Sequence, residues 1–196
     1  ISGVDEFVIP SVKTKDYMRY IGVDNFIHVV PTGTDFSKFA IENIDRVKLA
    51  NLMKKYRPDP SVVTLLVLGR VAKEKSIDVC LKSYAAFLKS KPRRKTQLLV
   101  VGGGPALEEL KLLAEELGIA HATTFVGRVL PDEVAYYYHL GDYFLCASLS
   151  ETQGLTFMES MASDLLVITR YDTILIGVSN DGETGFFYQG PDDFPQ

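Results

Sequence analysis

Tryptophan is absent from this chain of 196 residues, and cysteine and histidine are scarce. Two thiols are too few for a four-cysteine zinc site or a disulfide framework, so we interpret Cys80 and Cys146 as core residues in a reducing compartment. His28, His121 and His139 lie far apart in the sequence and share no ligand spacing, so no metal site is predicted.

Long apolar runs and a surplus of positive charge are also missing. Uninterrupted apolar runs such as Leu65–Leu68 are short, whereas a membrane span needs about 20 apolar residues. The formal net charge of −4 argues against a general nucleic-acid binder. With 46% hydrophobic residues the chain can bury a core, and its length predicts one ordinary domain.

Charge is distributed unevenly along the chain. Residues 70–95 carry nine basic and two acidic side chains, whereas residues 96–196 carry three basic and 15 acidic ones. The densest basic stretch, Lys89–Lys95, joins the end of a predicted helix to the start of a predicted strand. We interpret it as a solvated turn at the amino edge of the sheet, with attraction to anionic lipid as the alternative.

From residue 62 onward, short apolar runs alternate with segments of helical period. The runs are continuously apolar, as in strands that are covered on both faces. This order predicts an α/β fold with a parallel sheet and right-handed crossovers. The predicted strands are Val62–Leu68, Gln97–Val101, Thr123–Val126, Tyr143–Ala147 and Leu165–Thr169. The predicted helices are Ser76–Leu88, Leu107–Leu117, Asp132–Leu140 and Gly154–Ser163.

The first 61 residues have a less regular pattern. The elements predicted here are strands at 6–10 and 26–31, helices at Lys13–Tyr20 and Asp45–Tyr56, and a turn at Thr32–Phe36. Because the chain opens at Ile1 without a methionine and closes at Gln196 without a capping element, we expect it to be a piece of a longer protein.

Three loops of unusual composition fall at the carboxyl edge of the predicted sheet, where doubly wound folds bind ligands. In the first loop, Gly69–Lys75, the side chains of Arg70 and Lys75 flank the start of a helix. Free amides and two cations suit a phosphate group. The alternative is a solvated surface loop that happens to be basic.

The second loop contains three consecutive glycines, Gly102–Gly104, followed by Pro105. Glycine lets a ligand approach the backbone, and proline is favoured at a helix start. Leu107 stands where the dinucleotide-binding fingerprint would have its third glycine, so a tight turn without a ligand explains the loop equally well.

The third loop, Ser148–Gly154, carries Glu151, and Glu159 follows on the next helix, eight positions later. A carboxylate accepts hydrogen bonds from the vicinal hydroxyls that sugars present, and the amides of residues 153–155 offer a cradle for an anion. Alternatively, Glu151 only caps the helix and Glu159 is a surface residue.

Six motifs, taken in order, resemble the nucleotide-binding domain of the GT-B glycosyltransferases, specifically the retaining enzymes of glycosyltransferase family 4. They are VVPTGTDFSKF (29–39), LGRVAKEKSID (68–78), VVGGGPALEEL (100–110), FVGRV (125–129), SETQGLTFMESMA (150–162) and NDGETGFF (180–187). The resemblance implies a Rossmann-like α/β domain, the carboxyl-terminal half of a GT-B enzyme. It assigns residues 1–36 to a linker and remnant of the amino-terminal domain, and residues 37–196 to the domain that binds the nucleotide-sugar donor. The acceptor-binding domain is then expected to be absent from this chain, and the fragment is expected to be inactive.

The resemblance also implies roles for individual residues. Arg70 and Lys75 would hold the diphosphate of a nucleotide sugar, Glu159 the ribose hydroxyls, and Glu151, as the catalytic residue, the donor-sugar hydroxyls near the reacting carbon. The other implied donor-binding residues are Gly104, Arg128, Val129, Thr152, Gln153, Gly154 and Leu155, with the base received near Arg128 and Val129. No metal or other cofactor is implied, because the two cations neutralise the diphosphate.

Some positions depart from the family pattern. Asp164 and Leu166 stand where the family commonly has glycine and proline, and Arg170–Asp172 replaces small residues. Together with ETQGLT and DGETGFFY, this variant resembles the bacterial diacylglycerol glucosyltransferases. That resemblance implies transfer from UDP-glucose to a lipid acceptor by a cytoplasmic enzyme, peripheral at the inner membrane face, with a membrane surface as a candidate partner.

Three alternatives stay open at this stage. The protein is a family member with a polysaccharide or protein acceptor, a non-catalytic nucleotide-binding module, or a nucleotide-sugar epimerase of GT-B shape. The presence of both Glu151 and Glu159 disfavours the last two.

Overall fold

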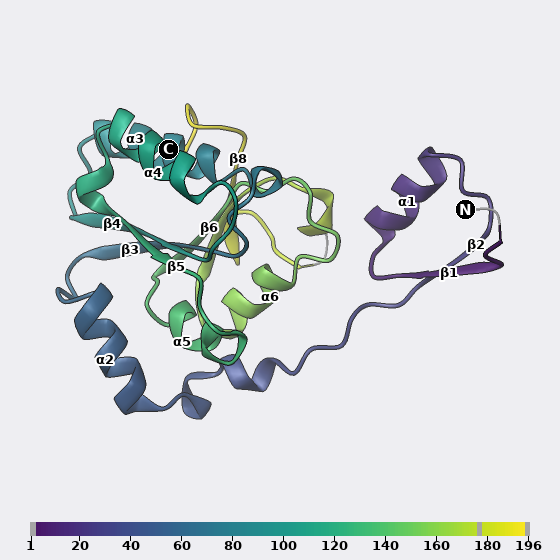
Figure 1. The fold of residues 1–196 in the computed structure, drawn as a ribbon, viewed down its shortest axis with the longest axis horizontal. Coiled ribbons are helices and arrows are strands. Elements are labelled where there is room, and N and C mark those ends of the chain that lie inside the picture. The colour runs from purple at the N-terminus through teal and green to yellow at the C-terminus, as the bar shows by residue number, and fades with distance from the viewer. Residues whose placement is uncertain (1–2, 176–177, 195–196) are drawn as a thin grey trace.

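The computed structural model describes residues 3–175 and 178–194 and contains two separate parallel sheets (Figure 1). The larger sheet has six strands in the order β5-β4-β3-β6-β7-β8, and the smaller one pairs β1 with β2. The strands are β1 Glu6–Ile9, β2 Phe26–Val29, β3 Val63–Leu68, β4 Thr96–Val101, β5 Thr123–Gly127, β6 Tyr143–Cys146, β7 Leu166–Arg170 and β8 Gly185–Tyr188. The α-helices are α1 Val12–Tyr20, α2 Arg46–Tyr56, α3 Ile77–Lys89, α4 Leu107–Glu116, α5 Val134–Tyr138 and α6 Leu155–Ala162.

The parallel α/β prediction is confirmed, and every predicted strand is present within two residues of its expected ends. Two details were wrong. The helix predicted over Asp132–Leu140 is instead a 3-10 turn at Pro131–Glu133 followed by the short helix α5. The strand β8, which pairs with β7 at the edge of the sheet, was not predicted from the sequence.

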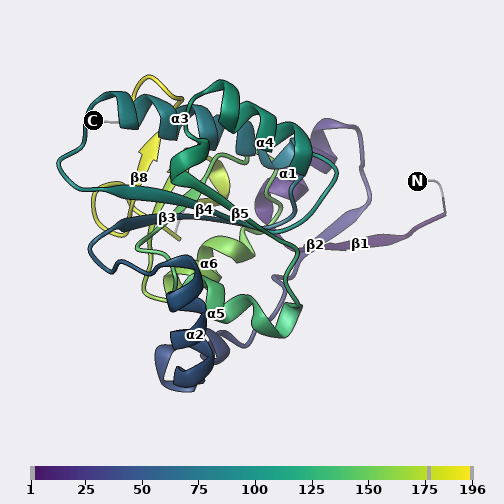
Figure 2. The same cartoon turned by 60° about the vertical axis from the view of Figure 1, so that its left-hand side comes forward.

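Helices cover both faces of the large sheet and create two apolar cores (Figure 2). Successive side chains of a strand point to opposite faces, so Leu65 and Val67 pack in the core beneath α3 and α4. Leu66, between them, packs in the other core with α2, α5 and α6. Burial on both faces explains why the strands are continuously apolar.

The strand order reverses between β3 and β6. From β3 the chain builds β4 and β5 on one side, then returns to pair β6 against the other side of β3, with Leu65 opposite Tyr143. The loops that follow β3 and β6 therefore leave the same sheet edge as neighbours. In open α/β sheets this reversal is the usual place for a ligand.

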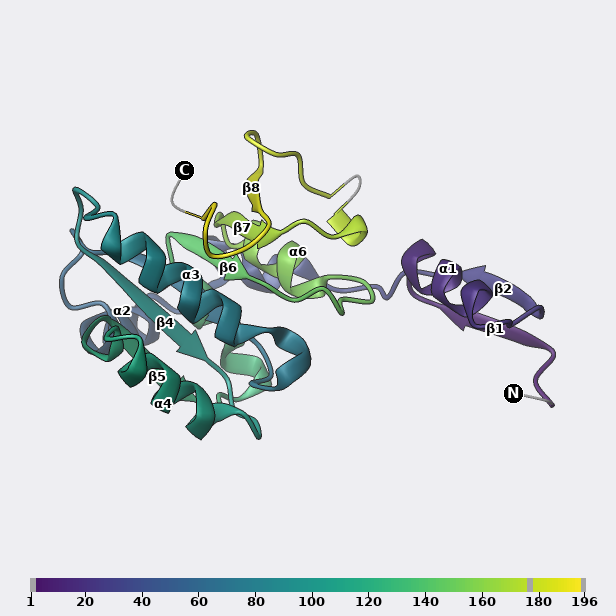
Figure 3. The ribbon, with the colours of Figure 1, turned by 90° about the horizontal axis from the view of Figure 1, so that it is seen from above.

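Residues 6–29 form a small β-α-β unit, in which α1 joins β1 to β2 beside the main body of the protein (Figure 3). Ser11 caps α1 by accepting a hydrogen bond from the amide of Thr14. The unit has its own small core of Ile9, Val23 and Ile27. An irregular stretch leads from it to Phe36, where a 3-10 turn begins in place of the predicted turn at 32–36. The boundary between the linker and the donor-binding domain, placed between residues 36 and 37, stays a prediction.

Within the described ranges, no helix is long and apolar enough to cross a membrane.

Candidate functional site

An ion pair connects the loops that follow β3 and β6. Lys75 ends the 3-10 turn Lys73–Lys75, and its Nζ donates a hydrogen bond of 2.8 Å to Oε1 of Glu151. The side chain of Glu151 is 10% exposed and that of Lys75 is 28% exposed, so the pair is largely shielded from water. The sequence marked both residues as candidates, and the structure brings them into direct contact at the strand-order reversal.

This pair lines a cavity of about 270 Å³ at the carboxyl edge of the sheet. Apolar residues of β3 and β6 also line it, together with Arg70, Cys80, Cys146 and Thr156. Burial raises the pKa of the Cys146 thiol to about 11, so this cysteine is neutral in the cavity wall. The cavity thus combines two cations, Arg70 and Lys75, one anion, Glu151, and apolar walls.

A second hollow of about 640 Å³ adjoins the first, because both are lined by Leu68, Gly69 and Arg70. It extends over the glycine loop to Arg128 and Val129. The Arg70 side chain is exposed and forms an ion pair with Glu74. Arg70 lines both hollows, so its exposed guanidinium is accessible to a ligand that occupies both.

Close backbone packing accounts for two of the three consecutive glycines. A Cβ atom on Gly102 would lie 1.8 Å from the carbonyl oxygen of Gly69, and one on Gly104 would lie 2.2 Å from that of Val71. The amide of Ala106 donates to the same Val71 oxygen. The backbones of the loops after β3 and β4 thus pack so closely that glycine is required at these two positions, whether or not a ligand is bound. The contact of Gly104 with the donor stays a prediction.

The helices that follow the two central loops both start at a residue in the left-handed conformation. Ser76 precedes α3 with φ of 50°, and Gly154 precedes α6 with φ of 72°. No side chain of the described residues caps either helix. The first-turn amides of a helix lack intrahelical partners and carry partial positive charge, so both starts favour an anion.

Gln153 makes a contact that the sequence analysis did not predict. Its side chain accepts a hydrogen bond of 3.0 Å from the amide of Thr32 and donates one of 3.1 Å to the carbonyl of the same residue. The Gln153 side chain therefore ties the loop after β6 to the linker. Its backbone amide is the group predicted to face the donor, and the neighbouring Thr152, also predicted to bind the donor, is exposed.

Glu159 lies on α6 and accepts a hydrogen bond from a tyrosine of the neighbouring helix α5. The hydroxyl of Tyr138, on α5, donates a hydrogen bond of 2.9 Å to Oε2 of Glu159. Burial raises the pKa of Glu159, while this hydrogen bond and the charge of Lys38 act in the opposite direction. Burial and the nearby Glu159 also raise the pKa of Tyr138, which therefore remains a donor.

The structure separates the two glutamates more than the sequence analysis expected. Among the described residues, those lining the two hollows include Glu151 but not Glu159. Glu159 is held by Tyr138 on the face of α6 that packs toward α5. The described residues also contain no group of three His, Cys, Asp or Glu side chains suited to holding a metal ion.

Comparisons of the sequence with family models and with curated proteins agree on one family. A family model described as glycosyl transferases group 1 matches residues 50–194. The alpha-monoglucosyldiacylglycerol synthase of Streptococcus pneumoniae is 37% identical over 190 residues, which cover 97% of this chain and 43% of that protein. The protein of that name from Acholeplasma laidlawii is 30% identical over 181 residues, covering 92% of this chain and 45% of that protein. The chain therefore spans less than half the length of these curated relatives.

A solved structure supports the fold assignment. The crystal structure of HepE from Anabaena, in complex with UDP and glucose, matches with a TM-score of 0.81 over 98% of this chain and 53% of that chain. Its sequence identity is 14%, so the similarity concerns the fold. The predicted Rossmann-like domain of GT-B type is confirmed.

Proposed function

Because the chain belongs to the glycosyl transferases group 1 family, we propose that it is the donor-binding part of a retaining glycosyltransferase that uses a nucleotide sugar. The observation that carries the proposal is the contact of Lys75 with Glu151 where the strand order reverses. A cation beside two uncapped helix starts suits a diphosphate, and the adjacent carboxylate suits sugar hydroxyls. One cavity thus offers both chemistries that a nucleotide sugar requires.

The two adjoining hollows are proposed to hold different parts of the donor. The smaller takes the diphosphate on Arg70 and Lys75 and the sugar hydroxyls on Glu151. The larger takes the base beside the backbone of Arg128 and Val129. Their shared wall, at the loop after β3, matches the position that the diphosphate has between base and sugar in such a donor.

Glu159 is proposed to bind the ribose hydroxyls. Tyr138 occupies its Oε2, which leaves Oε1 to accept hydrogen bonds from a ligand. The partly buried carboxylate gives stronger hydrogen bonds than an exposed one, since fewer water molecules compete. This assignment requires the ribose to reach past the rim of the two hollows toward α6.

The proposed chemistry needs positive charge at one place. Transfer breaks the bond between the sugar carbon and a phosphate oxygen, so negative charge builds on the leaving nucleoside diphosphate. Arg70 and Lys75, with the amides of Gly154 and Leu155 at the start of α6, stabilise that charge. Fixed cations and amides supply this stabilisation without a metal ion.

The donor is proposed to be UDP-glucose and the acceptor a diacylglycerol. The support is the name of the two bacterial relatives at 37% and 30% identity. Because the chain spans less than half of their length, we assign acceptor binding to an amino-terminal domain outside this chain. The complete enzyme would act at the cytoplasmic face of the membrane, and the chain alone would transfer no sugar.

We propose that the β-α-β unit is the end of this amino-terminal domain, whose remainder lies outside the chain. Its exposed apolar side chains support this proposal. Five large apolar residues of the unit are at least 60% exposed, which is unusual for a segment that is complete by itself. They are Val8, Val12, Tyr17, Tyr20 and Phe26.

Mass spectrometry of the product tests the proposed function. The complete enzyme is incubated with UDP-glucose and diacylglycerol, and its Glu151→Ala variant serves as the control. A diacylglycerol heavier by one hexose, absent with the variant, is the expected product. Transfer of the hexose only to another acceptor would contradict the lipid assignment, and failure to consume any nucleotide sugar would contradict the proposal as a whole.

A further inference from the structure

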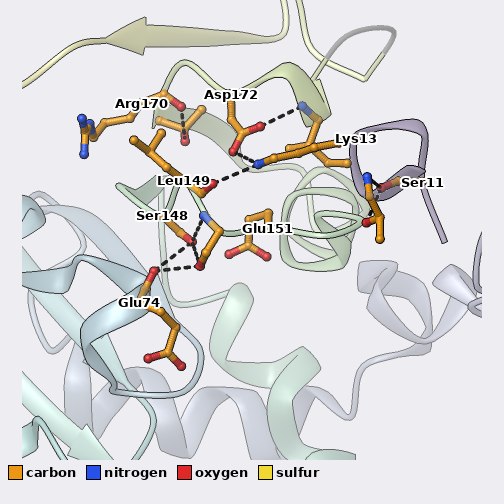
Figure 4. A network of polar contacts seen from close by, with 12 residues as sticks. Ser11, Lys13, Glu74, Ser148, Leu149, Glu151, Arg170 and Asp172 are labelled. Carbon is orange, nitrogen blue, oxygen red and sulfur yellow. Dashed lines mark hydrogen bonds and ion pairs between the residues drawn. The ribbon is translucent and has the colours of Figure 1, made fainter. Parts of the chain in front are cut away.

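Lys13, on α1, connects the β-α-β unit to the loop that carries Glu151 (Figure 4). Its ammonium group forms an ion pair with the carboxylate of Asp172 and donates a hydrogen bond of 2.9 Å to the carbonyl oxygen of Leu149. Leu149 is two residues before Glu151. A single side chain from α1 therefore touches both the loop after β6 and the loop after β7.

Asp172 is suited to hold this lysine firmly. Its side chain is 3% exposed, and a buried carboxylate needs a charged or hydrogen-bonding partner. Its Oδ1 accepts a hydrogen bond of 3.0 Å from the amide of Ile174, while Oδ2 faces Lys13. The carboxylate is thus fixed in orientation by its own loop and presents one oxygen to α1.

The other side of the Glu151 loop is held by the loop after β3. The hydroxyl of Ser150 donates a hydrogen bond of 2.9 Å to the carbonyl oxygen of Glu74, and that of Ser148 lies 3.4 Å from the same oxygen. Figure 4 shows Glu151 on a loop that is held by Glu74 on one side and by Lys13 on the other. The backbone around Glu151 is therefore fixed between two anchors.

We propose that Lys13 and Asp172 are positioning residues that set the place of Glu151 in the donor cavity. The Glu74 anchor lies in the 3-10 turn after β3, a strand of the same sheet as β6, whereas the Lys13 anchor comes from the β-α-β unit. The position of Glu151 therefore depends on the docking of that unit. This inference rests on the proposed function for the role of Glu151 toward the sugar.

The consequence is a separation between nucleotide and sugar recognition. Arg70 and Lys75 lie on the loop after β3, whereas the backbone next to Glu151 is held by Lys13 of α1. Loss of the Lys13 contact should leave UDP binding intact and remove the additional affinity that the glucosyl group contributes. It should also loosen the backbone from residue 148 to 151 without loosening the sheet.

Two measurements on Lys13→Met test this proposal, with Lys15→Met on the same helix as the matched control. Hydrogen exchange of the amides at 148–151 should accelerate about tenfold in Lys13→Met and remain unchanged in Lys15→Met, because local opening is limited by the contacts that hold the loop. The ratio of UDP-glucose affinity to UDP affinity should fall in the same variant, and Lys13→Arg, which keeps the charge, should restore both values.

The double variant Lys13→Met/Asp172→Asn should show no greater loss than Lys13→Met, since the Lys13–Asp172 ion pair is already absent from the single variant. Unchanged exchange at 148–151 would overturn the proposal, as would acceleration spread equally over α3 and α4, which indicates general destabilisation. If the unmodified protein binds neither ligand, the proposed function fails, while the exchange comparison still decides whether Lys13 fixes this loop.

Discussion

The ammonium group of Lys75 lies 2.8 Å from a carboxylate oxygen of Glu151, although the two residues follow different strands and are 76 positions apart. The pairing of β3 with β6 makes this contact possible. In the proposed function, a diphosphate arriving at Lys75 would meet a cation already held in place, and a sugar attached to the diphosphate would meet Glu151 next.

Replacement of Lys75 by methionine should weaken UDP binding by tenfold or more. The reason is the loss of a charged hydrogen bond, which contributes about 1.5–3 kcal/mol. Lys73→Met is the control, because Lys73 is exposed in the same turn and does not line the donor cavity. Calorimetric titration with UDP measures the affinity of both variants. Equal losses of UDP affinity would show that only the overall charge of the protein matters.

The two glutamates should differ in what they contribute. Glu159→Ala should reduce nucleotide affinity by about 1–3 kcal/mol, whereas Glu151→Ala should leave it nearly unchanged and reduce turnover in the complete enzyme. Glu115→Ala, an exposed change on α4, controls for lost negative charge. Equal damage to UDP affinity by the Glu151 and Glu159 changes would refute this division of roles.

The Tyr138–Glu159 hydrogen bond should make Tyr138→Phe a pH-dependent change. The hydrogen bond acts to lower the pKa of Glu159, so it is stronger when that carboxylate is ionised. At neutral pH the variant should lose about 1–2 kcal/mol of unfolding free energy, and the loss should shrink as the pH falls through the raised pKa of Glu159. Urea unfolding of both proteins at pH 7 and at acidic pH measures this difference. A loss of the same size at both values would mean that the hydroxyl does not respond to the charge.

Gly102→Ala should destabilise the fold by about 2 kcal/mol or more, because the new methyl group would overlap the carbonyl oxygen of Gly69 and the backbone must shift. Gly33→Ala is the matched control, since nothing lies within 4 Å of a Cβ there. Thermal unfolding compares the two. A tolerated alanine at position 102 would show that the loops after β3 and β4 do not pack as described.

Binding of UDP should not require a divalent metal. The cations Arg70 and Lys75 line the cavity proposed for the diphosphate, and helices without a side-chain cap follow the loops after β3 and β6. Calorimetry with and without a chelator should give the same affinity within error. Binding that disappears with the chelator would show that a metal ion supplies charge that the protein does not.

The sequence allowed much of the fold to be predicted, because burial on both sheet faces produces apolar runs such as Val63–Leu68 that are visible without a structure. It also located the two central loops, since parallel strands must place their carboxyl ends at one edge. The edge strand β8 was missed because its four residues follow a turn and include a glycine and an exposed Phe186.

The contacts within the site were beyond prediction for a different reason. Lys75 and Glu151 meet because β6 lies next to β3, and strand order is not encoded in the local pattern of either loop. Tyr138 belongs to a run of three tyrosines whose individual directions depend on where α5 begins. Lys13, 159 positions from Asp172, carries no local signal of its partner.

A crystal structure of this chain with UDP is the most direct test of the central claim, that a nucleotide sugar binds where the strand order reverses. The account predicts the diphosphate within hydrogen-bonding distance of Lys75, the ribose at Glu159 and the base beside Val129. A nucleotide bound instead at the opposite edge of the sheet, in the basic hollow lined by Arg93–Lys95, would contradict it.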